Sequence, residues 1–204
     1  MKEGVIQFHC SLQPPKQTWP DSLLAELNLW RGKMIEQGWI GQDAARYQGL
    51  GFGNLSIRYT LPKARDAFII TASQSGHRVR LDQQGWPLVV AADIVSNAVI
   101  ACGLRPPSSE ALSHAALYQA NQKIKAVIHV HSEFLWQGAF NLEYPSTAAD
   151  IGYGTPAMAN AIQQQAREDS GLLVMLGHQD GVLAWGESLQ QAAEQLETLE
   201  SRLG

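Results

Sequence analysis

The sequence has little cysteine and no long apolar run. Its two cysteines, Cys10 and Cys102, lie far apart and form no CxxC motif, which favours two reduced, buried thiols over a disulfide framework. No apolar stretch reaches the ~18 residues of a membrane span. The first four residues lead into an alternating segment rather than a signal-peptide apolar region. These absences predict a cytoplasmic chain without a membrane partner.

Positive charge is also sparse. Fifteen Lys and Arg residues are scattered among nineteen Asp and Glu, which gives a net charge of −4. The sequence has no basic run that would follow a phosphate backbone, so nucleic acid and anionic membranes are excluded as expected partners. A small-molecule partner remains the expectation.

The length of 204 residues, 45% of them hydrophobic, fits one domain over 1–204, with 1–20 as an amino-terminal strand and linker. Apolar periodicity predicts irregularly alternating helices and strands, without a repeated βαβ unit. We therefore expect a three-layer α/β/α fold with a largely antiparallel central sheet. Strands are expected at 4–10, 55–59, 66–71, 88–91, 98–102, 125–131, 172–176 and 182–185, and helices from residue 21 or 22 to about 38 and at 108–120, 133–140, 156–169 and 189–203.

The sharpest local feature is His129-Val130-His131, at the end of an expected strand. Residues i and i+2 of a strand face the same side, so both imidazoles point into one space. This spacing suits two neighbouring ligands of a zinc ion, at ~2.1 Å from each nitrogen. The alternative is two polar residues on a solvated strand face.

The helix before that strand begins Pro107-Ser108-Ser109-Glu110. Such a helix start presents free N–H groups and a partial positive charge. Ser108 equally fits an ordinary N-cap, with Glu110 complementing the helix dipole. If helix and strand pack antiparallel, Glu110 lies beside the two histidines as a metal ligand or a proton-transfer group.

A third nitrogen ligand must come from elsewhere in the chain. His178 follows the apolar segment 172–176 and lies in a turn between two glycines. His114, one helical turn after Glu110, is expected either to pack in the core or to contact the metal ligands without binding the metal itself. His9 and His77 are assigned no metal role.

The glycine-rich segment 49–54 has a spacing similar to that of a nucleotide-binding loop. A dinucleotide fingerprint follows a strand and opens a helix, whereas this segment opens a strand. We therefore reject that interpretation. Glycines here instead allow backbone N–H groups to approach an anion closely.

Five segments in this order, GLGFGNLSIR (49–58), IITASQSG (69–76), PSSEALSHAALYQ (107–119), AVIHVHS (126–132) and LGHQDGVLAWG (176–186), resemble the class II aldolase/adducin family. The resemblance extends from about Leu23 to the carboxyl end. It implies that His129, His131 and His178 hold one zinc, or another divalent ion, per chain. It also implies that Glu110 is the catalytic acid/base and a fourth ligand while substrate is absent.

The family pattern also implies a site for the substrate phosphate. Its residues are Asn54, Ser73 or Ser75, the Gly76 N–H, Ser108 and Ser109. Two departures from the pattern lie where substrate would bind. The family's usual NHG is here Gly177-His178-Gln179-Asp180-Gly181, and the usual TPSG loop is the longer TASQSG. Both leave the identity of the substrate, and whether it is phosphorylated, undetermined.

The resemblance implies an aldolase-type lyase, similar to the fuculose-phosphate aldolases, that acts on a sugar phosphate or related hydroxy-keto compound through a metal-stabilised enediolate. Dehydratase or epimerase chemistry on the same metal site and a non-catalytic, adducin-like interaction module are the alternatives. The family further implies a homo-oligomer, in particular a cyclic tetramer. Six tryptophans spread along the chain are compatible with interface aromatics or with simple burial.

Overall fold

A computed structural model describes residues 5–204, so the first residue of the strand expected at 4–10 lies outside the described residues. The helices are α1 (Asp21–Glu36), α2 (Ala111–Ala120), α3 (Glu133–Asn141), α4 (Pro156–Gln165) and α5 (Leu189–Leu203), with 3-10 turns η1 (Tyr47–Gly49) and η2 (Gln83–Gly85). The strands are β1 (His9–Gln13), β2 (Gly41–Gln42), β3 (Gly51–Phe52), β4 (Asn54–Arg58), β5 (Phe68–Ile70), β6 (Leu88–Asp93), β7 (Ala98–Cys102), β8 (Ala126–His131), β9 (Gly171–Val174) and β10 (Gly181–Gly186).

Eight of these strands form one sheet in the order β1-β7-β6-β5-β4-β8-β10-β9. The pair β1 and β7 is parallel, and every other neighbouring pair is antiparallel. The sheet is therefore mixed, although largely antiparallel as expected. Strands β2 and β3 form a separate two-stranded ribbon.

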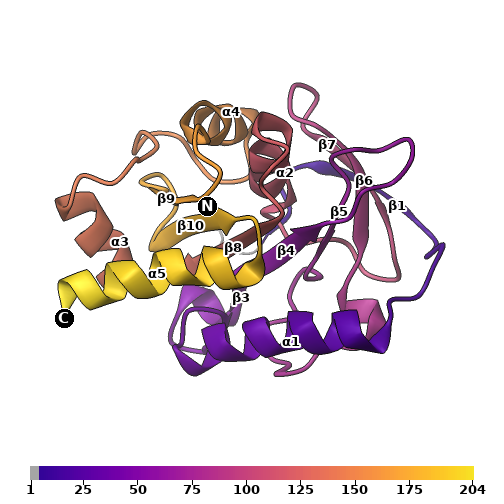
Figure 1. The fold of residues 1–204 in the computed structure, drawn as a ribbon, viewed down its shortest axis with the longest axis horizontal. Helices are drawn as coiled ribbons and strands as arrows, with labels where there is room; N and C mark the ends of the chain where they lie inside the picture. Colours follow the sequence, from indigo (N-terminus) through magenta and orange to yellow (C-terminus); the bar gives the residue numbers. More distant parts are fainter. Residues whose placement is uncertain (1–4) are drawn as a thin grey trace.

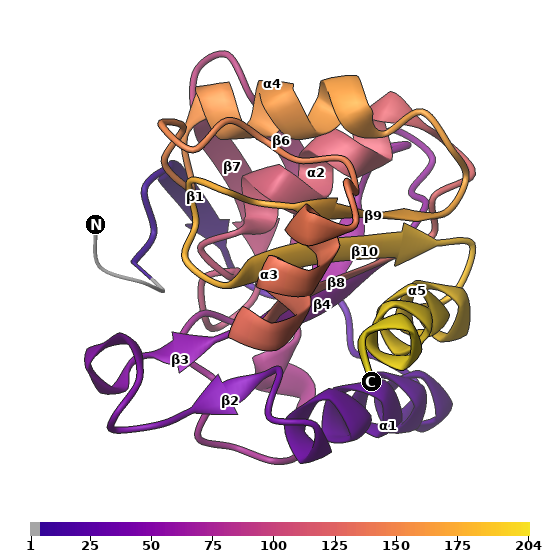
Figure 2. The same cartoon turned by 90° about the vertical axis from the view of Figure 1, so that its left-hand side faces the viewer.

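Helices cover both faces of this sheet (Figure 1). Helices α2 and α4 pack against each other on one face, whereas α1 and α5 lie on the other, with α5 on β8 and β10. Figure 2 shows the β2–β3 ribbon at the same end of the molecule as the amino-terminal end of α3. The expected three-layer α/β/α architecture is confirmed. None of the helices within residues 5–204 has the length and apolarity that crossing a bilayer requires.

The alternation of side chains along β8 divides the core between the two faces. Ala126, Ile128 and Val130 pack into the apolar cluster that contains residues of α1 and α5. Val127 packs into the opposite cluster, with residues of α2 and α4. Because strand side chains alternate, His129 and His131 belong to the face of Val127. The strand therefore directs both histidines towards the layer that contains α2.

Helix α2 begins later than the sequence predicts. Its first residue is Ala111, its N-cap is Glu110, and no side chain caps it, so the N-cap role considered for Ser108 is wrong. The Ser108 N–H instead donates to the Thr71 carbonyl at 3.0 Å. Pairing with the chain after β5 holds the segment extended, and the helix starts only where that pairing ends.

The first strand begins five residues and ends three residues further along the chain than expected. It forms at the sheet edge, in parallel register with β7 from His9 opposite Ala98 to Gln13 opposite Cys102. Residues 5–8 are described but form no strand. The strand predicted at 4–10 exists, but its bounds depend on a partner almost ninety residues away.

A buried polar triad lies between β4 and α2. The Ser56 hydroxyl lies 2.7 Å from both His114 Nδ1 and the Tyr118 hydroxyl. Burial lowers the pKa of His114 to about 3, so its imidazole is neutral in the folded protein at neutral and mildly acidic pH. His114 is thus a core residue behind Glu110, as the sequence suggested.

We expect His114 to destabilise the fold in mild acid. The histidine titrates near 6.5 in the unfolded chain and near 3 in the folded one, so the unfolded state binds the extra proton between these values. The free energy of unfolding should therefore fall as the pH drops from 7 to 5, by about 2 kcal/mol more in the wild type than in His114→Gln. Urea denaturation at the two pH values measures this difference, and an equal pH dependence in both proteins would contradict it.

Candidate metal centre

Two histidines at the end of β8 form the base of the site. His129 and His131 are fully buried, and their Nε2 atoms lie 3.0 Å apart. His129 Nδ1 lies 3.2 Å from the Val182 carbonyl oxygen on the neighbouring strand. A carbonyl only accepts hydrogen bonds, so Nδ1 carries the proton and the Nε2 lone pair faces the cluster.

The turn between β9 and β10 supplies the third histidine. His178 is 2% exposed, and its ring stacks on Tyr153 with 4.6 Å between the ring centroids. The preceding residue, Gly177, packs so tightly that an added Cβ would lie 1.8 Å from the Ile151 carbonyl oxygen. Only glycine fits there, and this close packing fixes the direction from which His178 enters the site.

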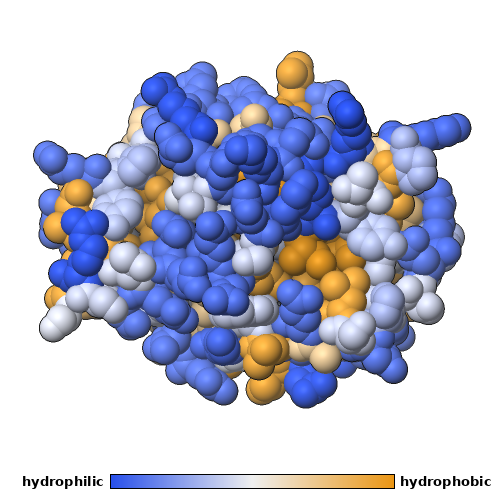
Figure 3. Space-filling view, in the orientation of Figure 1, coloured by the Kyte–Doolittle hydropathy of each residue, from blue (hydrophilic) through white to orange (hydrophobic). Residues whose placement is uncertain are grey.

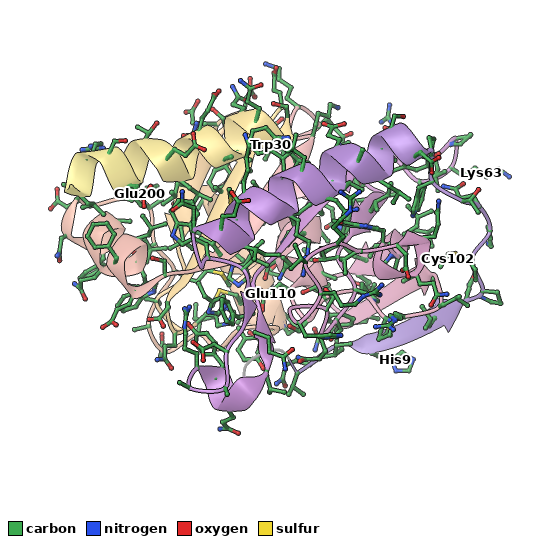
Figure 4. All side chains as sticks on the ribbon, turned by 90° about the horizontal axis from the view of Figure 1, so that it is seen from below. His9, Trp30, Lys63, Cys102, Glu110 and Glu200 are labelled. Atoms are coloured by element: carbon green, nitrogen blue, oxygen red, sulfur yellow. The ribbon has the colours of Figure 1, made fainter. Side chains whose placement is uncertain are left out.

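These three imidazoles fit a metal ion. One ring nitrogen from each lies within 4.8 Å of the others, and within residues 5–204 this is the cluster with metal-ligand geometry. A tetrahedral shell with zinc–nitrogen bonds of ~2.1 Å separates its donors by about 3.4 Å, so small movements bring all three into one shell. The other histidines lie elsewhere. Figure 4 shows His9 at the periphery, and His77 is exposed.

Glu110 adds a carboxylate to the cluster from the start of α2. It is 1% exposed and lies in the interior of the molecule (Figure 4). Its Oε1 lies 3.9 Å from His178 Nδ1, and the Ser113 hydroxyl donates to its Oε2. One carboxylate oxygen therefore faces the histidines, whereas the other is held by Ser113. Ser113 was not among the residues predicted from the sequence, although its position three residues after Glu110 places it on the same helix face.

The residues expected at the substrate phosphate also come together. They surround one small hollow, lined by Gly51, Gly53, Asn54, Ala72, Ser73, Gln74, Ser75, Gly76, Ser108 and Ser109. Asn54 pairs directly opposite His129 between β4 and β8, so the hollow adjoins the histidine cluster. Ser109, which lines the hollow, directly precedes Glu110 in the sequence, so Glu110 also lies next to the hollow.

The hollow is narrow in this structure. The space open to the centre of a water molecule is about 20 Å³, room for roughly one water. The side chain of Gln74, in the TASQSG loop (residues 71–76), accepts a hydrogen bond from the Gly51 N–H at 3.0 Å and so links the loop to β3. Gln74 is an exposed residue, so its side chain can turn outward into solvent. An anion as large as phosphate needs more room than the hollow offers here.

An open pocket of about 890 Å³ adjoins the histidines on another side. There the Tyr47 hydroxyl donates to Asp180 Oδ2 at 2.8 Å and accepts from Arg46, which also donates to the His131 carbonyl. Burial, and then the hydrogen bond to Asp180, raise the pKa of Tyr47, so it remains a neutral phenol. Tyr47, Gln48 and Asp180 all have positive φ, a conformation that non-glycine residues rarely adopt. None of these residues was predicted from the sequence to form such a network.

The Tyr47–Asp180 hydrogen bond ties the loop before β3 to the turn that carries His178. We expect Tyr47→Phe to loosen that turn and to raise the Kd for zinc several-fold, up to about tenfold, with a loss of about 1 kcal/mol in folding free energy. Zinc titration of the metal-free protein measures the change.

Tyr144→Phe is a matched control for this prediction. The Tyr144 hydroxyl accepts a hydrogen bond from the exposed Arg202 at 2.7 Å, and it belongs to a different part of the chain. Its loss should leave the zinc Kd unchanged. An equal zinc Kd in Tyr47→Phe and Tyr144→Phe would show that the tether does not support the site.

Comparisons with known proteins match this geometry to one family. A family model described as Class II Aldolase and Adducin N-terminal domain matches residues 43–203. A solved L-fuculose 1-phosphate aldolase is 21% identical, with a TM-score of 0.64 over 90% of this chain and 84% of that one. The L-fuculose-1-phosphate aldolase from Thermus thermophilus is 20% identical, with a TM-score of 0.64 over 89% of this chain and 91% of that one.

A third solved structure carries a broader description. YgbL from Escherichia coli, described as a putative aldolase/epimerase/decarboxylase, is 24% identical, with a TM-score of 0.63 over 88% of this chain and 86% of that one. At these identities the solved structures show a shared fold. The family model, which covers most of the chain, extends the likeness to the sequence.

Proposed function

The chain belongs to the class II aldolase and adducin family, and on this basis we propose that it is a metal-dependent carbon–carbon lyase of the aldolase type. We propose zinc, one ion per chain, as the metal, with another divalent ion as the alternative. The substrate is a sugar phosphate or a related hydroxy-keto compound. The observation that carries the proposal is the convergence of His129, His131 and His178 beside the buried Glu110.

The roles of the side chains follow from their contacts. A divalent ion held by the three histidines would supply Lewis-acid stabilisation of negative charge on the substrate's oxygens. Glu110 moves the proton at the carbon that gains negative charge when the carbon–carbon bond breaks. Ser113 keeps the carboxylate oriented, because it holds Oε2 while Oε1 faces the cluster. Glu110 and the three histidines are buried, and low exposure to solvent strengthens the electrostatic interactions among them.

The hollow beside Asn54 anchors the other end of the substrate. Amide, hydroxyl and backbone N–H donors line it, and they suit a phosphate or another oxyanion. When these donors hold the phosphate, the reacting carbons are positioned against Glu110. The donors themselves take no part in the bond cleavage. Similarity to solved structures described as L-fuculose 1-phosphate aldolases supports a phosphorylated substrate.

A product assay tests the proposal. Zinc-loaded protein is incubated with ketose phosphates and with 2-keto acids, and the products are followed by NMR. We expect two carbonyl fragments from one substrate, and we expect chelation to abolish their formation. Loss of water or inversion of a hydroxyl without fragments would instead identify a dehydratase or an epimerase. No turnover by fully zinc-loaded protein would favour the adducin-like interaction module.

We further propose a homo-oligomer, in particular a cyclic tetramer. Apolar side chains are exposed on and just after α3: Phe134 is 55%, Phe140 47% and Leu142 37% exposed. Figure 3 shows apolar side chains among polar ones at the end of the molecule where α3 lies. Trp19, Trp39, Trp86 and Trp185 are buried within the chain itself, so the tryptophans contribute little to this argument.

Light scattering tests the assembly. We expect a mass about four times the 22.3 kDa of one chain, because a closed ring covers the apolar end of every subunit. A mass near that of one chain would refute the oligomer, whereas a dimer would refute only the tetramer.

We propose the cytoplasm as the location of the protein in the cell. Cys10 and Cys102 are both free thiols, of which only Cys102 is buried.

A further inference from the structure

Two buried arginines in this chain differ in how their charge is balanced. Arg58 lies on β4, and its guanidinium pairs with the Asp66 carboxylate at 2.9 Å. Arg31 lies on α1 and is 1% exposed, yet no carboxylate among residues 5–204 lies within ion-pair distance of it. A buried cation without a counter-charge is costly to the fold. Arg31 therefore calls for a reason beyond packing.

The Arg31 guanidinium donates its hydrogen bonds to backbone carbonyls at the end of the TASQSG loop and just beyond it. Its NH2 group donates to the Ser75 carbonyl oxygen at 2.9 Å. Its NH1 group donates to the carbonyl oxygens of Arg78 and Val79. Burial, and then repulsion from Arg78, lower the pKa of Arg31 to about 10, which leaves it charged at neutral pH.

The peptide between Ser75 and Gly76 connects Arg31 to the hollow. The described chain contains no cis peptide bond, so the C=O and N–H of this peptide point in opposite directions. Because Arg31 holds the carbonyl on one side, the Gly76 N–H points away from it, and Gly76 lines the hollow. A hydrogen bond to the carbonyl also polarises the peptide and makes its N–H a stronger donor.

The position of Gly76 leaves little room for adjustment. An added Cβ would lie 2.0 Å from the Gly41 carbonyl oxygen, so the loop must pass here without a side chain. No charged residue lines the hollow itself. Among the described residues, the Arg31 guanidinium is thus a cation held one peptide behind the surface that an anion would touch.

We propose that Arg31 is a positioning residue for substrate binding, which orients and polarises the Ser75–Gly76 peptide so that the Gly76 N–H receives an oxyanion in the hollow. The bound anion supplies the counter-charge that Arg31 lacks. This inference rests on the proposed function only for the identity of the anion, the phosphate of the substrate. It adds a residue outside the histidine cluster, on a helix that supplies no member of that cluster.

Calorimetric titration with inorganic phosphate tests this role in the zinc-loaded full chain. Arg31→Met and Arg31→Gln should raise the phosphate Kd by about tenfold or more, because the charge and the hydrogen bond to Ser75 are both lost. Arg31→Lys keeps the charge and should fall between these variants and the wild type. Zinc content should stay the same in all of them.

Arg58→Met is the matched control, because Arg58 is also buried and also donates to several backbone carbonyls. It should lower the stability to urea without changing the phosphate Kd. Three results would overturn the proposal: a phosphate Kd unchanged in the Arg31 variants, an equal rise in Arg58→Met, or a wild type that does not bind millimolar phosphate. Carbon–carbon cleavage of an unphosphorylated substrate in that last case would leave the lyase proposal intact.

Discussion

Replacing His131 by alanine is expected to strip the metal from the protein and abolish turnover while the chain remains folded. His129→Ala should do the same. Each removes one of three nitrogen donors, and we expect zinc affinity to fall by at least about 100-fold, since changes merely adjacent to ligands already cost roughly 10–100-fold. The sheet persists because β8 pairs with β10 along its whole length and with β4 from Ala126 to His129. Zinc content by atomic absorption and the melting temperature measure the two effects.

Two other histidines serve as controls for these variants. His77→Ala changes an exposed histidine, and His114→Gln changes a buried one that faces Ser56. Both should keep a full complement of zinc. Unchanged metal content in both His129→Ala and His131→Ala would rule out this metal centre.

Glu110→Gln is expected to keep the metal and lose the activity. The amide occupies the same volume and can still receive the Ser113 hydrogen bond through its oxygen. It cannot take up a proton, and removal of a general acid/base lowers turnover by roughly 10²–10⁴-fold. The turnover number of zinc-loaded protein, measured beside its zinc content, distinguishes this effect from loss of the metal.

Glu133→Gln is the control for Glu110. Glu133 is also the acidic residue at a helix start, at the beginning of α3, but it lines the open pocket rather than the histidine cluster. It should retain activity close to that of the wild type. Activity of Glu110→Gln within threefold of the wild type would return Glu110 to a purely structural role at the start of α2.

The sequence was informative where short-range rules act. The i, i+2 spacing of His129 and His131 determines their common face in any strand, and β8 confirms it. Glu110 was expected near them if its helix packs antiparallel to the following strand, and the structure places its Oε1 3.9 Å from Nδ1 of His178, the third histidine of the cluster. The expected fold class is also confirmed. It was inferred from apolar periodicity, which is a local property of each helix and strand.

Features that depend on distant partners could not be predicted in this way. The bounds of β1 follow from β7, and the late start of α2 follows from pairing with Thr71. The contacts of Tyr47 with Asp180 span 133 positions, and those of Arg31 with Ser75 span 44. No local pattern in either segment distinguishes such a residue from an ordinary surface tyrosine or helical arginine.

Anomalous diffraction at the zinc absorption edge, from crystals of the protein grown with zinc, tests the central claim most directly. The account predicts one strong peak per chain at about 2.1 Å from a ring nitrogen of each of His129, His131 and His178, with the Glu110 carboxylate beside it. Zinc bound elsewhere on the chain, with no peak between these three rings, would contradict it.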